Sequence, residues 1–343
     1  MLNVAVAFVP VLLFAAGLQL MDSFRLVPRR AVLTAVGVGA VVALACVGLH
    51  GWLEPTLAAG PLAVGRAGFS RYVAPATEEV LKAAFLGLLI IRRRVGFLVD
   101  AAVQGFAVGA GFALVENITY LAAREAPLQL WVIRGLGTAM LHGATTAIFA
   151  IVAKVFADRH PDRALLAAVP GLAVAVGIHS AFNHVPLPPA AMTLLLLAVL
   201  PVLMVQVFQR SEAATREWVV GGLDLDVELL HLVASDALGF THFGQYLQRL
   251  RQRFDGPVVL DMVCLLRLQL ELSVQAKAMI VAREAGLDVP IDADLPAALA
   301  ELDYLERSIG AAGMLALKPL QVTSHRDDWH RFLLASARNV PRA

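Results

Sequence analysis

Ionisable side chains lie within several long apolar segments of this chain, where they could act as acids, bases or metal ligands. One segment contains two adjacent acids, Glu78 and Glu79, followed by Lys82. On a helix this lysine lies three or four residues beyond each acid and can reach either of them. One carboxylate is therefore left without a full partner, and a carboxylate in apolar surroundings is suited to take a proton from water. The spacing alone does not distinguish the two acids.

Three further apolar segments carry polar side chains that could complete such a site. They contribute another acid, two histidines and an amide. Histidines and carboxylates are ordinary zinc ligands, whereas histidine and asparagine could stabilise an oxyanion. Both mechanisms stay open, and the metal ligands would come from Glu79, Glu116, His142 and His179 if an ion is present. The candidate catalytic residues are Glu78, Glu79, Glu116, His142, His179 and Asn183, with Lys82, Asn117 and Tyr120 as supporting residues.

The segments that must position these groups are long and hydrophobic. Hydrophobic residues make up 59% of the 343 residues and charged residues 16%, whereas a soluble domain carries about 25% charge. The net charge of +1 does not support nucleic-acid binding, and the two isolated cysteines exclude a disulfide scaffold. The remaining histidines of this region, His50, His160 and His184, are predicted to lie in solvated loops. Seven segments are predicted to span a membrane: 3–21, 31–49, 73–91, 97–122, 130–153, 164–184 and 188–208.

Charge divides the chain into two predicted domains. Residues 1–209 hold 14 basic and 9 acidic residues, whereas the 134 residues of 210–343 hold 14 and 18. This predicts an all-α fold: a polytopic membrane helix bundle of about seven spans, followed by a soluble helical domain. Short helices are expected in that domain, the longest over 258–285, but no catalytic motif. It is predicted to bind a cytoplasmic protein partner or to associate with itself.

Loop charges predict the orientation, because basic residues accumulate in cytoplasmic loops. The loops at 22–30, 92–96 and 154–163 carry three bases each, and the alternate loops carry fewer. The N-terminus is therefore expected outside and the C-terminal domain in the cytoplasm.

Depth in the membrane supports a single site. At about 1.5 Å per residue, Glu78, Glu116 and His179 lie roughly 8 to 9 Å from the outer ends of their segments, and His142 roughly 12 to 18 Å. Burying each charge costs about 2.5 to 3.5 kcal/mol. That cost also applies to Arg134, which lies within the segment at 130–153. The groups must therefore pair with one another or line a watered cavity, which we expect in the outer half of the membrane.

Four motifs follow one another along these segments: Glu78-Glu79-x-x-Lys82, Gly109-x-Gly111-Phe112-x-x-x-Glu116-Asn117 with Tyr120, His142, and His179-x-x-x-Asn183. In order and composition they resemble the motifs of the PrsW family of intramembrane proteases, which is related to the CAAX prenyl endopeptidase and bacteriocin-processing superfamily. The resemblance covers about residues 70–185.

The resemblance implies a peptide hydrolase of a bacterial cytoplasmic membrane. It implies cleavage of a membrane-anchored protein near its outer face, as when an anti-sigma factor is trimmed in a stress response. By similarity Glu78 is the base, Glu79 pairs with Lys82, and His179 with Asn183 polarises the carbonyl. The family is described both as metalloproteases and as glutamate proteases, so the resemblance leaves a metal such as zinc open.

Two other functions use buried acids and bases. An ion-coupled transporter usually binds its ion near the midplane between internal repeats, and the sequence has neither a repeat nor a midplane cluster. A non-catalytic membrane scaffold would use the same groups as structural ion pairs. Other intramembrane hydrolases are excluded, because the chain has no HExxH, no GxSG motif in a span and no paired transmembrane aspartates.

Overall fold

The computed structural model describes residues 2–61, 63–123, 127–287 and 294–320, together with 329, 331, 333 and 334. Every regular element in these ranges is helical, so the all-α prediction is confirmed. The chain divides into two compact units, Met1–Glu212 and Ala213–Ala343. The predicted domain boundary lies near Gln209 and Arg210.

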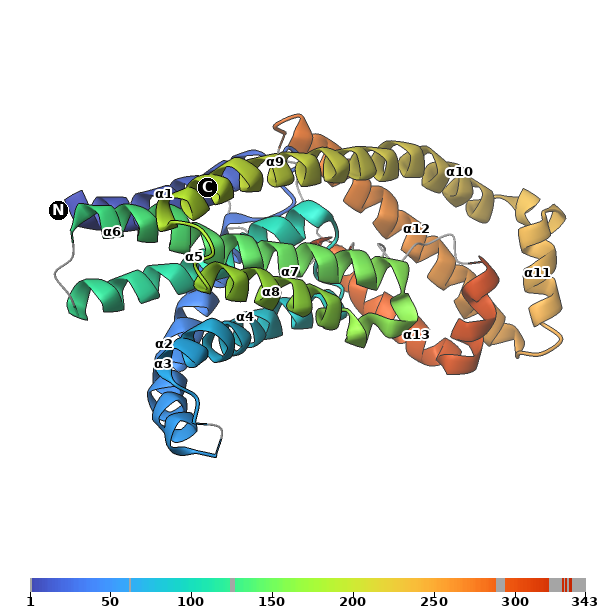
Figure 1. The fold of residues 1–343 in the computed structure, drawn as a ribbon. Coiled ribbons are helices and arrows are strands. Elements are labelled where there is room, and N and C mark those ends of the chain that lie inside the picture. The colour runs from blue at the N-terminus through green and yellow to red at the C-terminus, as the bar shows by residue number, and fades with distance from the viewer. Residues whose placement is uncertain are drawn as a thin grey trace. The chain divides into compact units, whose positions relative to one another are not determined.

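The first unit contains the apolar helices (Figure 1). In chain order its elements are α1 (Leu2–Leu20), α2 (Arg29–Ala59), α3 (Arg66–Gly68), η1 (Phe69–Val73), α4 (Ala74–Ile91), α5 (Leu98–Ala123), α6 (Leu128–Val132), η2 (Ile133–Thr138), α7 (Ala139–Arg159), η3 (Pro161–Leu166), α8 (Ala168–Asn183) and α9 (Pro189–Arg216). Two of the short elements, η1 and η2, are π-helical and lead directly into α4 and α7.

Six helices of the described ranges are long and apolar enough to cross a membrane: Leu2–Leu20, Arg29–Ala59, Leu98–Ala122, Leu128–Arg159, Pro161–Asn183 and Pro189–Ala234. They include six of the seven predicted spans. The other predicted span, 73–91, forms the 18-residue helix α4, whose Glu78, Glu79 and Lys82 make it the most polar of the seven. The protein is therefore an integral membrane protein with six candidate spans, and α4 as a seventh stays a prediction.

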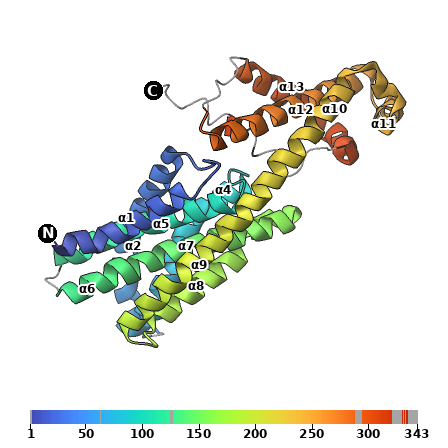
Figure 2. The same ribbon diagram turned by 90° about the horizontal axis from the view of Figure 1, so that it is seen from above.

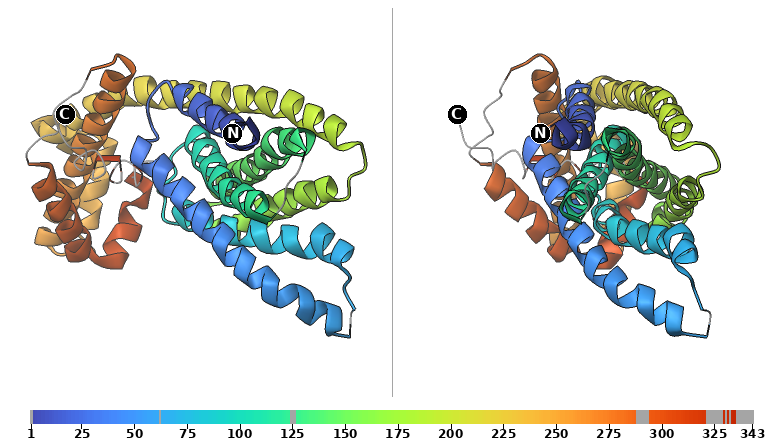
Figure 3. Two further views of the ribbon diagram at one scale, coloured as in Figure 1. Left: turned by 90° about the vertical axis from the view of Figure 1, so that its left-hand side faces the viewer. Right: turned by 60° about the vertical axis from the view of Figure 1, so that its left-hand side comes forward.

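Helix α5 lies at the centre of the first unit, where it packs against α7, α2 and α1 (Figure 3). Every residue from Val99 to Ala113 is buried, as expected for a helix that is apolar all round and enclosed by others. The outer helices instead expose large apolar side chains, including Leu13, Leu33 and Leu194. Such a surface is suited to contact with lipid.

Glycines bring α5 against its neighbours at the level of the polar groups. A Cβ atom added at Gly109 would lie 2.1 Å from the carbonyl oxygen of His142 in α7, and one at Gly111 would lie 2.0 Å from that of Val36 in α2. No side chain fits at such distances, so the backbones are in direct contact, as is common where membrane helices pack. This contact places His142 beside the helix that carries Glu116.

The second unit is also helical. Its elements are η4 (Glu217–Gly221), α10 (Gly222–Ala234), η5 (Asp236–Phe240), α11 (His242–Leu250), α12 (Gly256–Glu284), α13 (Leu295–Leu317) and η6 (Lys318–Leu320). The long helix α12 packs against both α10 and α13 (Figure 2). It corresponds to the helix predicted over 258–285. At its start α11 is capped by Thr241, whose side chain accepts a hydrogen bond from the backbone N–H of Gly244.

Candidate functional site

Glu79 lies at the centre of a fully buried network. Its Oε1 accepts hydrogen bonds from Lys82 Nζ at 2.6 Å, from His179 Nδ1 at 2.8 Å and from Thr145 Oγ1 at 3.1 Å. These donors come from α4, α8 and α7, so the carboxylate joins three helices. Its other oxygen, Oε2, has no hydrogen-bond partner. Glu79, rather than Glu78, is thus the acid that pairs with Lys82, which the spacing alone left open.

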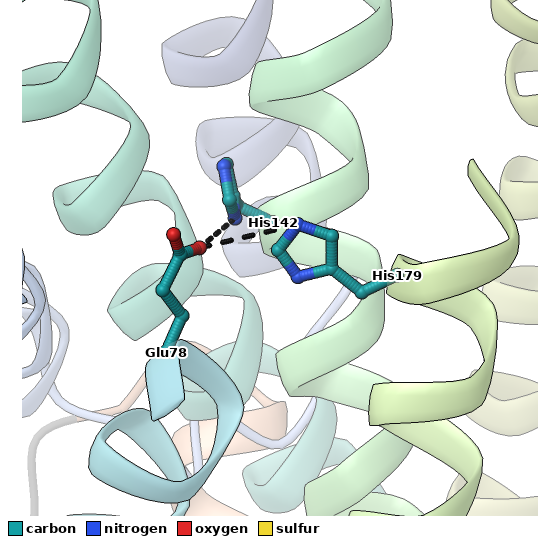
Figure 4. A group of neighbouring side chains, drawn as sticks. All are labelled: Glu78, His142 and His179. Carbon is teal, nitrogen blue, oxygen red and sulfur yellow. Dashed lines mark ion pairs between the residues drawn. The ribbon is translucent and has the colours of Figure 1, made fainter. Parts of the chain in front are cut away.

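Glu78 has different surroundings, although it is the next residue. Its Oε2 is buried and has no hydrogen-bond partner. The nearest basic atoms are His179 Nε2 at 3.9 Å and His142 Nδ1 at 4.0 Å. Figure 4 shows the carboxylate reaching from α4 toward both rings. The side chain of Glu78 is 13% exposed and that of Glu79 is 1% exposed, so Glu78 is the more accessible of the two acids.

Each of the two histidines forms a hydrogen bond to a carboxylate through the ring nitrogen that points away from Glu78. An ionised carboxylate can only accept hydrogen bonds, so His179 Nδ1, 2.8 Å from Glu79 Oε1, carries the proton. In the same way His142 Nε2, 3.0 Å from Glu116 Oε2, carries the proton of that ring. The opposite nitrogens are then unprotonated, and these are the nitrogens nearest Glu78. His142 Nδ1 also accepts from Lys82 Nζ at 3.2 Å.

A second network surrounds Glu116. Arg134 Nη2 lies 3.2 Å from Glu116 Oε2, the oxygen that accepts a hydrogen bond from His142. Arg134 Nε donates to Asn117 Oδ1 at 3.0 Å, and its guanidinium lies 3.5 Å from the centroid of the Tyr120 ring. All the supporting residues predicted from sequence therefore lie in the two networks: Lys82 beside Glu79, and Asn117 and Tyr120 beside Arg134.

The residues around Glu78 fit a divalent metal ion. Glu78, His142 and His179 each offer one ligand atom, and these atoms lie within 4.8 Å of one another. Two imidazole nitrogens and one carboxylate oxygen are ligands of the kind found in catalytic zinc sites. Metal-binding histidines usually donate their other N–H to a carboxylate, as both do here. This set of metal ligands differs from the one predicted from sequence. Glu79 and Glu116 accept hydrogen bonds from the ring nitrogens that point away from Glu78, whereas Glu78 faces the unprotonated nitrogens.

Asn183 is not joined to this cluster by any contact among the described residues. Its side-chain amide donates to the carbonyl oxygen of Ser70 at 2.9 Å. Sharing a face with His179 therefore did not bring it to Glu78, because the end of α8 is tied to η1 instead.

The prediction that His50 lies in a solvated loop is wrong. Helix α2 continues to Ala59, beyond the apolar segment that was used to place its end. His50 is half-buried within it, with Nε2 2.7 Å from Thr77 Oγ1. His184, beyond α8, is also half-buried, whereas His160 is exposed beyond α7.

No site role was predicted for Thr145 or Arg134, although both contact the central acids. Arg134 had a detectable signal, since a cation within an apolar segment needs a partner. Thr145 had none, because threonines are common on the faces where helices pack.

A family model described as PrsW family intramembrane metalloprotease matches residues 27–208, more than half of the chain. The matched region contains all of the candidate site residues. No curated protein and no solved structure matches the chain. With the buried cluster of acids and histidines on its membrane helices, the chain belongs to the PrsW family of intramembrane metalloproteases and is a membrane peptidase.

Proposed function

We propose that this protein hydrolyses a peptide bond of a membrane-anchored protein at the centre formed by Glu78, His142 and His179. The observation that supports this is a buried carboxylate oxygen without a hydrogen-bond partner, facing two imidazole nitrogens that carry lone pairs. A buried polar atom left unpaired is costly. It is retained where a ligand, a water or a substrate completes its interactions.

In this proposal Glu78 acts directly on the attacking water. The water oxygen attacks the carbonyl carbon of the scissile bond. The Glu78 oxygen that does not face the two imidazoles takes a proton from that water, while Oε2, which faces them, would be the ligand atom for an ion. The same proton can then pass to the nitrogen of the leaving amine. Glu79 is too enclosed for this role, because three donors occupy one of its oxygens and its side chain is 1% exposed.

Glu79 and Glu116 act as positioning residues. Each accepts the N–H of one histidine and so keeps the other nitrogen unprotonated toward Glu78. In that state neither facing nitrogen can donate to an oxyanion, which supports a metal-assisted reaction over stabilisation of the oxyanion by His179. A divalent ion such as zinc, held by Glu78, His142 and His179, would polarise the scissile carbonyl and activate the water. Because Asn183 donates to Ser70, it has no part in the proposed step.

The substrate and location follow from the loop charges and the resemblance. We propose that the protein lies in a bacterial cytoplasmic membrane with its N-terminus outside, and that the site opens toward the outer half of the bilayer. The substrate is then a protein with a single membrane span, cut near the outer end of that span. An anti-sigma factor of a stress response is such a protein. The helical unit from residue 213 onward is proposed to be a cytoplasmic domain for partner binding or self-association.

The test is cleavage of a single-span reporter by the purified full-length protein in lipid bilayers. We expect one cut near the outer end of the span, located by the masses of the two products. A strong chelator should abolish cleavage and added zinc should restore it. Cleavage at the cytoplasmic end would contradict the proposed orientation, and no cleavage of any reporter would contradict the substrate class.

A further inference from the structure

Arg134 is a buried cation close to the proposed centre but not part of it. It lies in the π-helical turn η2 just before α7 and is 6% exposed. π-Helical turns within α-helices often occur at functional sites. A buried guanidinium is costly unless it is paired. Arg134 Nη2 lies 3.2 Å from Glu116 Oε2 but forms no hydrogen bond of good geometry. Its position must therefore be maintained by other contacts.

Those contacts come from α5, which is itself bound to α1. Asn117, on α5, accepts a hydrogen bond from Arg134 Nε and donates its own Nδ2 to the backbone carbonyl of Ala7 on α1. The ring of Tyr120, also on α5, lies against the guanidinium at 3.5 Å. Contact with an aromatic ring together with a directed hydrogen bond fixes an arginine far more strictly than it would fix a lysine. The guanidinium is thus placed with its charge against one oxygen of Glu116.

That oxygen links Arg134 to the site. Glu116 Oε2 is also the atom that accepts the N–H of His142. The Glu116 side chain is 27% exposed, so without a neighbouring cation its carboxylate would be free to turn away from the ring. His142 would then lose the acceptor that keeps its proton on Nε2, and Nδ1 would no longer present a lone pair to Glu78.

We propose that Arg134 is a positioning residue, which acts through Glu116 to hold His142 with its unprotonated Nδ1 toward Glu78. This inference rests on the proposed function, because it assigns Arg134 to the same centre. It predicts that loss of Arg134 changes the protonation pattern of one imidazole ring and slows turnover without changing substrate affinity.

The test is nitrogen NMR of the full-length protein with ¹⁵N-labelled histidine rings in lipid nanodiscs, after treatment with a strong chelator so that no ion occupies His142 Nδ1. The His142 signals are assigned by their absence in His142→Asn. In the wild type we expect a protonated Nε2 and an unprotonated Nδ1. In Arg134→Met the proton should be shared between the two nitrogens, while the signals of His179 stay unchanged. Unchanged His142 signals in a folded Arg134→Met variant would overturn the proposal.

Kinetics supply the second measurement. Mutation of groups that orient metal ligands typically costs 10- to 100-fold in affinity or activity, so we expect kcat of Arg134→Met to fall roughly 10- to 100-fold with little change in KM. Arg134→Lys should recover part of this loss. Lys154→Met, which removes a buried cation paired with Asp158 in α7, should leave kcat unchanged.

A double-mutant cycle distinguishes action through Glu116 from a separate structural role. If Arg134 acts through that acid, Arg134→Met combined with Glu116→Gln should be no slower than the slower single variant. Additive losses would overturn the proposal. Should Arg134→Met not fold, the same cycle and spectra can be run with Arg134→Lys. The NMR result does not require turnover, so a protein that shows the tautomer change without peptidase activity would contradict the proposed function alone.

Discussion

Each unit of the chain buries a lysine against an acid, and the two pairs differ in what surrounds them. In the second unit Asp226 Oδ2 accepts hydrogen bonds from Lys277 Nζ and Ser273 Oγ, both at 2.6 Å, and all three residues are buried. In the first unit Glu79 accepts from Lys82 in the same manner. In the first unit another acid, Glu78, lies beside the pair with a buried oxygen that has no hydrogen-bond partner, and the described residues of the second unit contain no such atom.

This difference separates a structural pair from a site. Among the described residues, no buried side-chain atom of Asp226, Ser273 or Lys277 lacks a hydrogen-bond partner, so their cluster is complete without a ligand. The cluster around Glu78 is not complete. Buried polar groups in proteins are nearly always hydrogen-bonded, and an exception calls for an explanation. The proposed metal ion and its water would provide it here.

The largest effect should come from Glu78→Gln. The variant keeps the shape of the side chain but removes the base, so we expect cleavage of the reporter to fall roughly 10²- to 10⁴-fold while the protein stays folded. Asp226→Asn is the matched control, since it neutralises a buried acid of the other unit and should leave cleavage intact at temperatures where the protein stays folded. Wild-type turnover by Glu78→Gln would rule out this acid as the base.

Lys277→Met should lower the stability of the second unit and leave cleavage unchanged, the opposite of Glu78→Gln. Removing one partner of a buried ion pair leaves an uncompensated charge and costs about 3 to 5 kcal/mol. We expect faster hydrogen–deuterium exchange in α10 and α12 of the full-length protein, with reporter cleavage unchanged. Replacing both partners, as Asp226→Leu with Lys277→Met, should restore most of the protection. If the double variant is as unprotected as the single one, the pair is more than a structural contact.

Glu79→Gln should lower activity less than Glu78→Gln. The amide can still accept from His179, but it no longer pairs with the ammonium of Lys82, so the ring is held less firmly. We expect a decrease of roughly 10- to 100-fold in kcat, measured on the same reporter. A loss as complete as that of Glu78→Gln would mean that the roles of the two acids overlap.

Thr145→Val should have the smallest effect. It removes one of three donors to Glu79 Oε1 without changing the shape of the side chain, and one hydrogen bond is worth about 0.5 to 1.5 kcal/mol. We therefore expect a decrease in kcat of roughly 2- to 10-fold. The neighbouring Thr146→Val is the control, because Thr146 Oγ1 donates to the backbone of His142 and not to Glu79. Equal decreases of kcat in both variants would mean that the effect arises from altered packing of α7 and not from the hydrogen bond to Glu79.

Much of the fold could be predicted from apolar runs, because lipid requires long helices whose backbone groups are paired internally. Each predicted segment coincides with a helix, but helix ends were missed where the sequence becomes polar before the helix stops. Helix α2 is the clearest case, since it continues to Ala59 through His50 and Glu54. Hydropathy indicates whether a segment contacts lipid or water, but it does not show where the hydrogen-bonded helix ends.

The site could be predicted as a set of residues but not as a set of pairs. Spacing on one helix allowed Lys82 to reach either Glu78 or Glu79, and the choice depends on His179 and Thr145, which approach from other helices. In the same way Asn183 shares a helix face with His179, yet its amide is bound to Ser70. Such pairings depend on tertiary contacts that the spacing within one segment does not contain.

The most direct test of the account is the zinc content of the purified full-length protein. We predict about one tightly bound zinc ion per chain in the wild type, as the three ligand atoms of one site imply. This ion should be lost in Glu78→Gln and retained in Asp226→Asn. A wild-type protein that cleaves its reporter at full rate without bound metal, or a Glu78→Gln variant that keeps its zinc, would contradict the assignment of Glu78, His142 and His179 as the metal centre.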